Sequence, residues 1–152
     1  MSKWTFHYLV RIEFLGFRYH GWQKQSKLKS VQGMVDKTFQ FIMGNEDFKT
    51  LGCGRTDAKV SADDFAFELF ANTPFECDNL LARLNKELPS DIRVKYVEVL
   101  SPEFNIIQHS KIKEYHYYFS FGEKSHPFNA PLIRDFGTHL NVDAMKEAVE
   151  LF

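Results

Sequence analysis

Hydrophobic and polar positions alternate in three parts of the chain, residues 6–14, 64–70 and 92–100. A period of two places alternate side chains on opposite faces of a strand, so each stretch predicts a β-strand. In the last stretch the alternation assigns Ile92, Val94 and Tyr96 to one face, and Val97 and Val99 to the other. Two further strands are predicted at 48–53 and, dense in aromatic residues, at 113–121.

Helical spacing replaces this alternation in three other places. Hydrophobic residues between Val31 and Ile42 recur every three or four positions, after a possible Ser30 cap and before a Gly44-Asn45 stop. A second helix is predicted over 79–88, with Asp78 as its cap. A third is predicted over 142–152, capped by Asn141.

The order of elements through Leu100 is strand, helix, strand, strand, helix, strand. This order predicts an α+β fold of the ferredoxin-like split βαβ type, with an antiparallel sheet and both helices on one face. The later strand and the C-terminal helix would extend it. The helix ends on Leu151 and Phe152 without a C-cap, which suggests that the chain is part of a longer protein.

Composition and charge limit the classes of protein to which this chain can belong. The chain has 152 residues, 44% hydrophobic and 26% charged, as expected of a globular domain with a buried core. The net charge of −1 gives no global attraction for nucleic acid, so RNA binding would depend on local lysine clusters. Two cysteines without metal-ligand spacing predict neither a metal site nor a disulfide scaffold. Without a signal-peptide or membrane-spanning pattern, a cytoplasmic location is expected.

Residues 54–58, Gly-Arg-Thr-Asp-Ala, form a turn between two predicted strands. A carboxylate beside an arginine stays ionised, and an ionised carboxylate in a concave site can attack an electron-poor carbon. Asp57 is therefore a candidate nucleophile, with Arg55 as its neighbour. The same residues also suit an ordinary Asx turn with no catalytic role.

Five segments together resemble the tRNA pseudouridine synthase A family. Residues 54–58 match the start of its GRTDAGVHA signature, and residues 17–25 are similar to its F/Y-x-G-W-Q-x-Q segment. Residues 30–32 match its S-V-Q helix start, 85–92 resemble its N-x-x-L-P-x-D-I stretch, and 113–117 resemble its K/R-x-Y-x-Y strand. All five occur in family order across nearly the whole chain, so the match is far more specific than any one motif.

The resemblance implies an enzyme that isomerises uridine to pseudouridine in tRNA, without a metal or cofactor. Asp57 would be the nucleophile that acts on a flipped-out uridine. Arg55 would help displace the base, and Tyr115 would stack on it. Gly54 and Thr56 would complete the substrate-binding turn.

The loop before the first helix would lie near the RNA. Trp22, Gln23 and Lys24 would make stacking and backbone contacts, and Lys27 and Lys29 would bind phosphates. For Trp22 an alternative stays open, since its indole could instead fill the edge of the core.

Three positions depart from the family pattern. Lys59 replaces a glycine, which suggests that a positive φ is no longer required there. Ser61 replaces a histidine, and Ile107 stands where the family has an arginine. These changes put substrate affinity and site choice in doubt but leave the chemistry of Asp57 plausible.

The resemblance also implies a homodimer that binds tRNA across both subunits and modifies the anticodon stem-loop. Residues 1–152 would be the N-terminal catalytic domain, and a second half would supply a basic partner for the aspartate. Little or no turnover is then expected from residues 1–152 alone, and rates equal to those of a longer form would refute this. Two alternatives are a catalytically silent RNA-binding module and a ferredoxin-like protein-interaction domain.

Overall fold

The computed structural model describes residues 3–109 and 112–151. Contacts within the chain form two compact units, Met1–Lys113 (unit 1) and Glu114–Phe152 (unit 2). The single catalytic domain expected over residues 1–152 thus comprises two units, and its role stays a prediction.

Unit 1 has the predicted order of elements around one four-stranded sheet. The strands lie in the order β2-β3-β1-β4, and every neighbouring pair is antiparallel. This topology and the two helices confirm the predicted α+β, ferredoxin-like fold. In chain order the elements are β1 (Phe6–Phe14), η1 (Gly16–Arg18), α1 (Val31–Met43), β2 (Phe48–Gly52), β3 (Ala62–Ala71), α2 (Cys77–Glu87), β4 (Ile92–Val99) and α3 (Ile106–His109).

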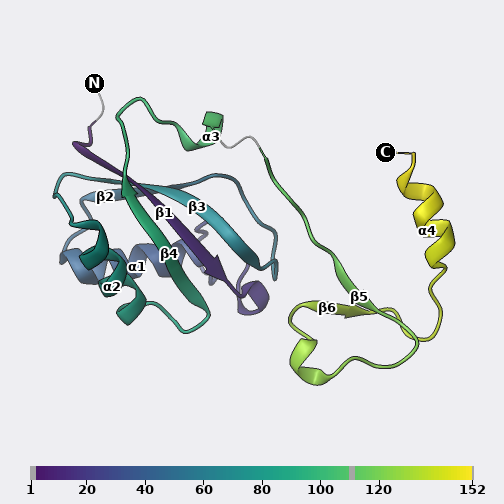
Figure 1. The fold of residues 1–152 in the computed structure, drawn as a ribbon. Helices are drawn as coiled ribbons and strands as arrows, with labels where there is room; N and C mark the ends of the chain where they lie inside the picture. Colours follow the sequence, from purple (N-terminus) through teal and green to yellow (C-terminus); the bar gives the residue numbers. More distant parts are fainter. Residues whose placement is uncertain (1–2, 110–111, 152) are drawn as a thin grey trace. The chain divides into compact units, whose positions relative to one another are not determined.

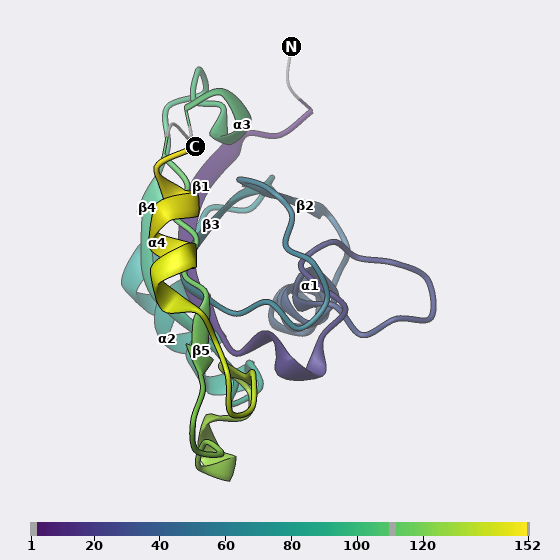
Figure 2. The same ribbon diagram turned by 90° about the vertical axis from the view of Figure 1, so that its right-hand side faces the viewer.

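Both long helices cover the same face of this sheet (Figure 1). Tyr8, Val10 and Ile12 point from β1 into a core that also contains Phe39 of α1 and Leu84 of α2. Figure 2, in which α1 is seen end-on, shows this helix to one side of β1. The alternation of residues in the sequence therefore identified the buried face of the central strand.

The opposite face of the sheet is polar and is partly covered by α3. Glu68, which is buried, accepts a hydrogen bond from the backbone N–H of Ile106 at 3.4 Å. Its other carboxylate oxygen lies 3.4 Å from Nδ1 of buried His7. Arg11 and Asp64 form an ion pair elsewhere on this face. The second face thus carries the Arg11–Asp64 ion pair and the polar side chains of His7 and Glu68, where the first is packed with hydrophobic residues.

The helix termini follow the sequence signals, with one correction. The Ser30 hydroxyl accepts a hydrogen bond from the N–H of Gly33, and Gly44 ends α1 with a φ of 71°. At α2 the predicted cap, Asp78, is wrong, because the side chain of Glu76 accepts the bonds from the N–H groups of Asp78 and Asn79. The longer side chain of Glu76, two residues before Asp78, reaches both donors.

The predicted facing of β4 is wrong beyond Val94. Arg11 pairs with Tyr96 and Ile12 with Val94, so Lys95 is an additional residue that forms a β-bulge. The bulge turns Val97 into the core and leaves Tyr96 exposed. A bulge of this kind turns the side chains that follow it to the opposite face of the sheet, and the alternation of hydrophobic and polar residues in the sequence does not reveal it.

Asn85 of α2 occupies the free edge of β4. Its side chain donates to the carbonyl of Val94 at 2.9 Å and accepts from the N–H of Val94 at 2.8 Å. We expect Asn85→Ala to lower the free energy of unfolding by about 1–3 kcal/mol, because two backbone groups lose their partner. Urea unfolding tests this, with exposed Asn79→Ala in the same helix as the control. Equal losses in the two variants would contradict it.

Unit 2 contains β5 (Tyr118–Ser120), η2 (Pro127–Asn129), β6 (Ile133–Asp135) and α4 (Val142–Val149). The strand predicted over 113–121 is much shorter, because β6 supplies a parallel partner only for residues 118–120. Asn141 caps α4 as predicted, accepting from the N–H of Ala144 at 3.0 Å. The helix ends at Val149, before the predicted residue 152, which lies outside the described residues. Within the part of the chain described, no helix has both the length and the apolar character needed to cross a membrane.

Candidate active site

Asp57 lies on a loop of residues 53–61 between β2 and β3, here called the Asp57 loop. Three hydrogen bonds join this loop to residues 16–22. The Ser61 hydroxyl accepts from the N–H of Gly16 at 2.9 Å, and the N–H of Lys59 donates to the carbonyl of Tyr19 at 3.0 Å. The N–H of Trp22 donates to the carbonyl of Thr56 at 3.4 Å. The Asp57 loop is therefore held on both sides of Asp57, at Thr56 and at Lys59 and Ser61.

Two glycines allow this close approach of backbones. A β-carbon at Gly16 would lie 1.8 Å from the carbonyl oxygen of Val60, and one at Gly21 would lie 2.1 Å from that of Thr56. Gly21 also has a φ of 81°, a conformation that side chains disfavour. Glycine at these positions thus permits the observed position of the Asp57 loop.

Trp22 packs beneath the Asp57 loop as part of the core. Its side chain is 1% exposed, and its ring lies 4.5 Å from that of Phe65 and 5.5 Å from that of Phe67, between centroids. A β-carbon at Gly52 would lie 2.4 Å from the indole nitrogen, so the missing side chain makes room for the ring. Of the two interpretations left open, the structure places the indole in the core, where it is not available to stack on RNA.

The start of α1 holds the segment that carries Trp22. The N–H of Val31 donates to the carbonyl of Gly21, and the N–H of Gln32 donates to that of Trp22. The Gln32 side chain accepts from the N–H of Lys24 at 2.9 Å and donates to Thr50. The Ser-Val-Gln motif therefore fixes the loop to the helix. These bonds also occupy amide groups that an anion would otherwise bind.

The side chains of Gln23 and Lys24 lie at the surface of this segment. Gln23 is half-buried and Lys24 is exposed. The Lys24 ammonium forms an ion pair with Asp36 at 3.2 Å, and the Lys29 ammonium lies 4.9 Å from the centre of the Tyr19 ring. Lys27 is exposed and has a φ of 69°. The predicted basic cluster is thus at the surface, although Lys24 already has a carboxylate partner.

Sequence reasoning did not identify Asp91 as part of the support of the Asp57 loop. Asp91 accepts hydrogen bonds from the hydroxyl of buried Tyr19 at 2.7 Å and from Nε of Arg18 at 2.9 Å. Burial alone would raise the pKa of Asp91, but these two donors hold it below its ordinary value. Burial and the bond to Asp91 raise the pKa of Tyr19. The signal available in the sequence was Asp91 itself, within the Leu-Pro-Ser-Asp-Ile match.

Replacement of Asp91 by alanine should lower stability in a pH-dependent way. The pKa of Asp91 is lower in the folded state, so its contribution is present above the unfolded value, near pH 4, and is lost in stronger acid. We expect Asp91→Ala to cost about 1–3 kcal/mol at pH 7, because buried Tyr19 loses its acceptor. Urea unfolding at pH 7 and pH 3 should show the difference from wild type narrowing in acid. A constant difference, or an equal loss in the exposed Asp63→Ala, would contradict this.

Asp57 and Arg55 are both exposed on this fixed loop. Within residues 3–109 and 112–151, neither side chain forms an ion pair, with the other or with any third group. The expected contact between carboxylate and guanidinium is therefore not formed. Both side chains are exposed and without an ion-pair partner among the described residues, so both remain available to a ligand.

The remaining residues of the turn differ in burial. The hydroxyl of Thr56 is buried and has no hydrogen-bond partner among the described residues. Gly54 is half-buried and lies against the side chain of Lys113. Among the residues that the structure describes, no group of three or more His, Cys, Asp or Glu side chains is placed to bind a metal.

The backbone conformation of Lys59 differs from the one predicted. Lys59 was expected to have lost the requirement for a positive φ, but its φ is 68°. The hydrogen bond from its N–H to Tyr19 holds this conformation. Ser61 has a structural role through Gly16, and Ile107 is exposed on α3.

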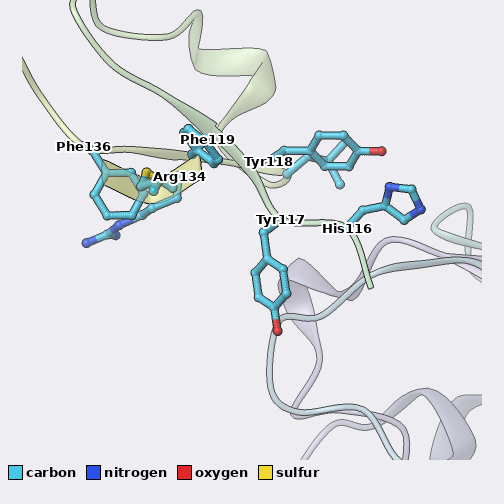
Figure 3. A pocket seen from close by; sticks show the side chains of 8 residues that line it. His116, Tyr117, Tyr118, Phe119, Arg134 and Phe136 are labelled. Carbon is cyan, nitrogen blue, oxygen red and sulfur yellow. The ribbon is translucent and has the colours of Figure 1, made fainter. Parts of the chain in front are cut away.

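Tyr115 belongs to unit 2, where it lies before β5 rather than in a strand, and it is 69% exposed. Unit 2 also contains a pocket of about 440 Å³, lined in part by the residues that follow Tyr115 in sequence (Figure 3). None of the residues predicted for the active site lines it. Its lining residues are His116, Tyr117, Tyr118, Phe119, Leu132, Arg134, Phe136 and Met145.

Comparison with curated proteins gives a consistent match. The tRNA pseudouridine synthase A of Aquifex aeolicus is 34% identical over 146 residues, which are 96% of this chain and 60% of that protein. The tRNA pseudouridine synthase A 1 of Protochlamydia amoebophila is also 34% identical, over 95% of the chain and 57% of that protein. That of Clostridium tetani is 35% identical over 91% of the chain and 57% of that protein. The chain is a homologue of tRNA pseudouridine synthase A.

This relationship covers nearly all of the chain but only part of its relatives. The chain spans about 60% of the length of the curated tRNA pseudouridine synthases that it matches first, consistent with an N-terminal half. No protein-family model matches it. The segments that resemble the synthase motifs meet in unit 1 around the Asp57 loop, with Tyr115 as the exception in unit 2.

Proposed function

We propose that this chain carries the catalytic aspartate of a tRNA pseudouridine synthase. The observation that supports this most strongly is Asp57 itself, an exposed carboxylate without an ion-pair partner, on a loop fixed to the rest of unit 1 at three points. A structural aspartate in a turn is expected to hydrogen-bond its own loop. The Asp57 side chain makes no such bond among the described residues, so its carboxylate would be free to act on a ligand.

The reaction is a neutral isomerisation. The bond between N1 of uracil and C1′ of ribose breaks, a bond between C5 and C1′ forms, and N1 takes up a proton as C5 loses one. Asp57 would attack the substrate and be released unchanged at the end, as a nucleophilic catalyst. Because the exchange needs no electron donor or acceptor, the protein groups can carry it without a cofactor.

The neighbouring residues would bind the displaced nucleotide. The unpaired guanidinium of Arg55 would enter the RNA helix as the uridine leaves it, since extracting a base costs a few kcal/mol. The exposed ring of Tyr115 would stack on the uracil. Gly54 and Thr56 would shape the turn beneath it, and Gln23 and Lys24 would contact the RNA backbone.

The wider assignment follows from the same relationship. The substrate would be tRNA, with uridines of the anticodon stem-loop as targets, and the enzyme would work in the cytoplasm as a homodimer. A net charge of −1 is compatible with RNA binding only if local cations such as Lys27 and Lys29 make the phosphate contacts.

Removal of the gene from its own cells tests this function. Pseudouridines are mapped in tRNA by carbodiimide adducts and primer extension, before and after removal and after restoration of the gene. We expect at least one tRNA position to lose pseudouridine and to regain it with the restored gene. An unchanged map after removal would contradict the proposal.

A further inference from the structure

We propose that Lys113 binds a phosphate of the RNA beside the target uridine, at the Gly54 end of the Asp57 loop. This inference rests on the proposed function and adds a binding residue to it. Lys113 is far from the loop in sequence, but a β-carbon at Gly54 would lie only 3.0 Å from its Nζ and 3.6 Å from its Cε. The ammonium therefore lies against the turn that carries Asp57.

This ammonium has no partner among the described residues, neither a hydrogen bond nor an ion pair. Two other lysines of unit 1 do have oxygen partners, since Lys24 pairs with Asp36, and Lys95 contacts Glu13 and the carbonyl of Asp63. Lys113 is also exposed, so a ligand can reach it.

The position of Lys113 suits a phosphate better than a role as counter-ion to Asp57. The two charged groups are not within ion-pair distance, so the carboxylate does not occupy the ammonium. Lysine binds phosphate as a compact point charge with three rotatable donors. Arg55, next to Gly54 in sequence, is a second exposed cation of this turn without an ion-pair partner among the described residues.

The experiment measures tRNA affinity as a function of salt for the full-length protein, for Lys113→Gln and for Lys113→Arg. Each phosphate contact adds about 0.7–0.9 to the slope of log affinity against log salt concentration. We expect Lys113→Gln to reduce this slope by about that amount and Lys113→Arg to keep it. Lys37→Gln, an exposed lysine on α1, is the matched control and should keep the wild-type slope.

Each other outcome overturns the inference in a recognisable way. An unchanged slope in Lys113→Gln, or an equal fall in Lys37→Gln, would show that Lys113 does not bind a phosphate. The proposed function would be unaffected by either result. An unchanged slope with loss of product at saturating tRNA means that Lys113 acts on Asp57 instead. A wild-type protein that does not bind tRNA overturns both the inference and the proposed function.

Discussion

Changing Asp57 to asparagine is expected to abolish pseudouridine formation while leaving tRNA binding intact. Asparagine has nearly the same shape, but its amide cannot act as an anionic nucleophile. We expect turnover to fall by at least about a thousandfold, because the covalent step loses its nucleophile. Binding should persist, because the cations of the site and the contacts that hold the loop use other atoms. Product is measured by mapping tRNA from cells that carry the variant, and binding by titration of the purified protein.

The matched control is Asp63→Asn. Asp63 is an exposed aspartate at the start of β3, only six positions away, and its described contact uses the backbone carbonyl. This variant should retain both binding and product. Full modification by Asp57→Asn would exclude the carboxylate as the nucleophile, and loss of binding in the same variant would assign Asp57 to recognition instead.

Changing Gly21 to alanine is expected to displace the Asp57 loop. The new β-carbon would lie 2.1 Å from the carbonyl oxygen of Thr56, and the positive φ adds about 1–2 kcal/mol of backbone strain. Since the clash involves backbone on both sides, neither side can yield by a change of rotamer. Product formation should fall to background, and the free energy of unfolding should fall by more than the strain alone.

Gly44→Ala separates the clash from the strain. Gly44 has a φ of 71°, close to that of Gly21, but a β-carbon there would meet nothing within 4 Å. It should therefore show the strain of about 1–2 kcal/mol and retain full product formation. Equal stability and activity in the two variants would show that the contact of Gly21 with Thr56 does not position the loop.

The fold of unit 1 could be predicted because its signals are local. Alternation along residues 6–14 identified β1 with its observed bounds, and Ser30 and Gly44 identified the ends of α1. The facing of β4 could not be predicted, since the bulge at Lys95 depends on pairing with β1 and leaves no mark on the pattern. Sequence periodicity therefore predicts elements better than register.

The candidate site was predicted from motifs, and its supporting contacts were not. Asp57 and Arg55 could be singled out by residue type, but Asp91 and Lys113 join the site through contacts across the fold. Trp22 shows the same limit, because an aromatic residue in a glycine-containing loop suits either a core or an RNA surface. Only the packing against Phe65 and Phe67 distinguishes the two.

Lys59 shows that a residue type can mislead about backbone conformation. Lysine in place of glycine suggested a loop without a positive φ, yet the φ is 68°. The hydrogen bond to Tyr19 and the neighbouring bond from Val60 to Asp57 fix the turn whichever residue is present. Tertiary contacts here outweigh a local preference of about 1–2 kcal/mol.

The most direct measurement is the identity of the protein atom that becomes bonded to RNA during the reaction. The full-length protein is mixed with tRNA, quenched in acid within one turnover, digested with protease and nuclease, and its peptides are weighed by mass spectrometry. A nucleotide should be found on the peptide that contains Asp57 and should be absent from Asp57→Asn. A nucleotide on any other peptide, in a reaction that makes pseudouridine, would contradict the central role of this carboxylate.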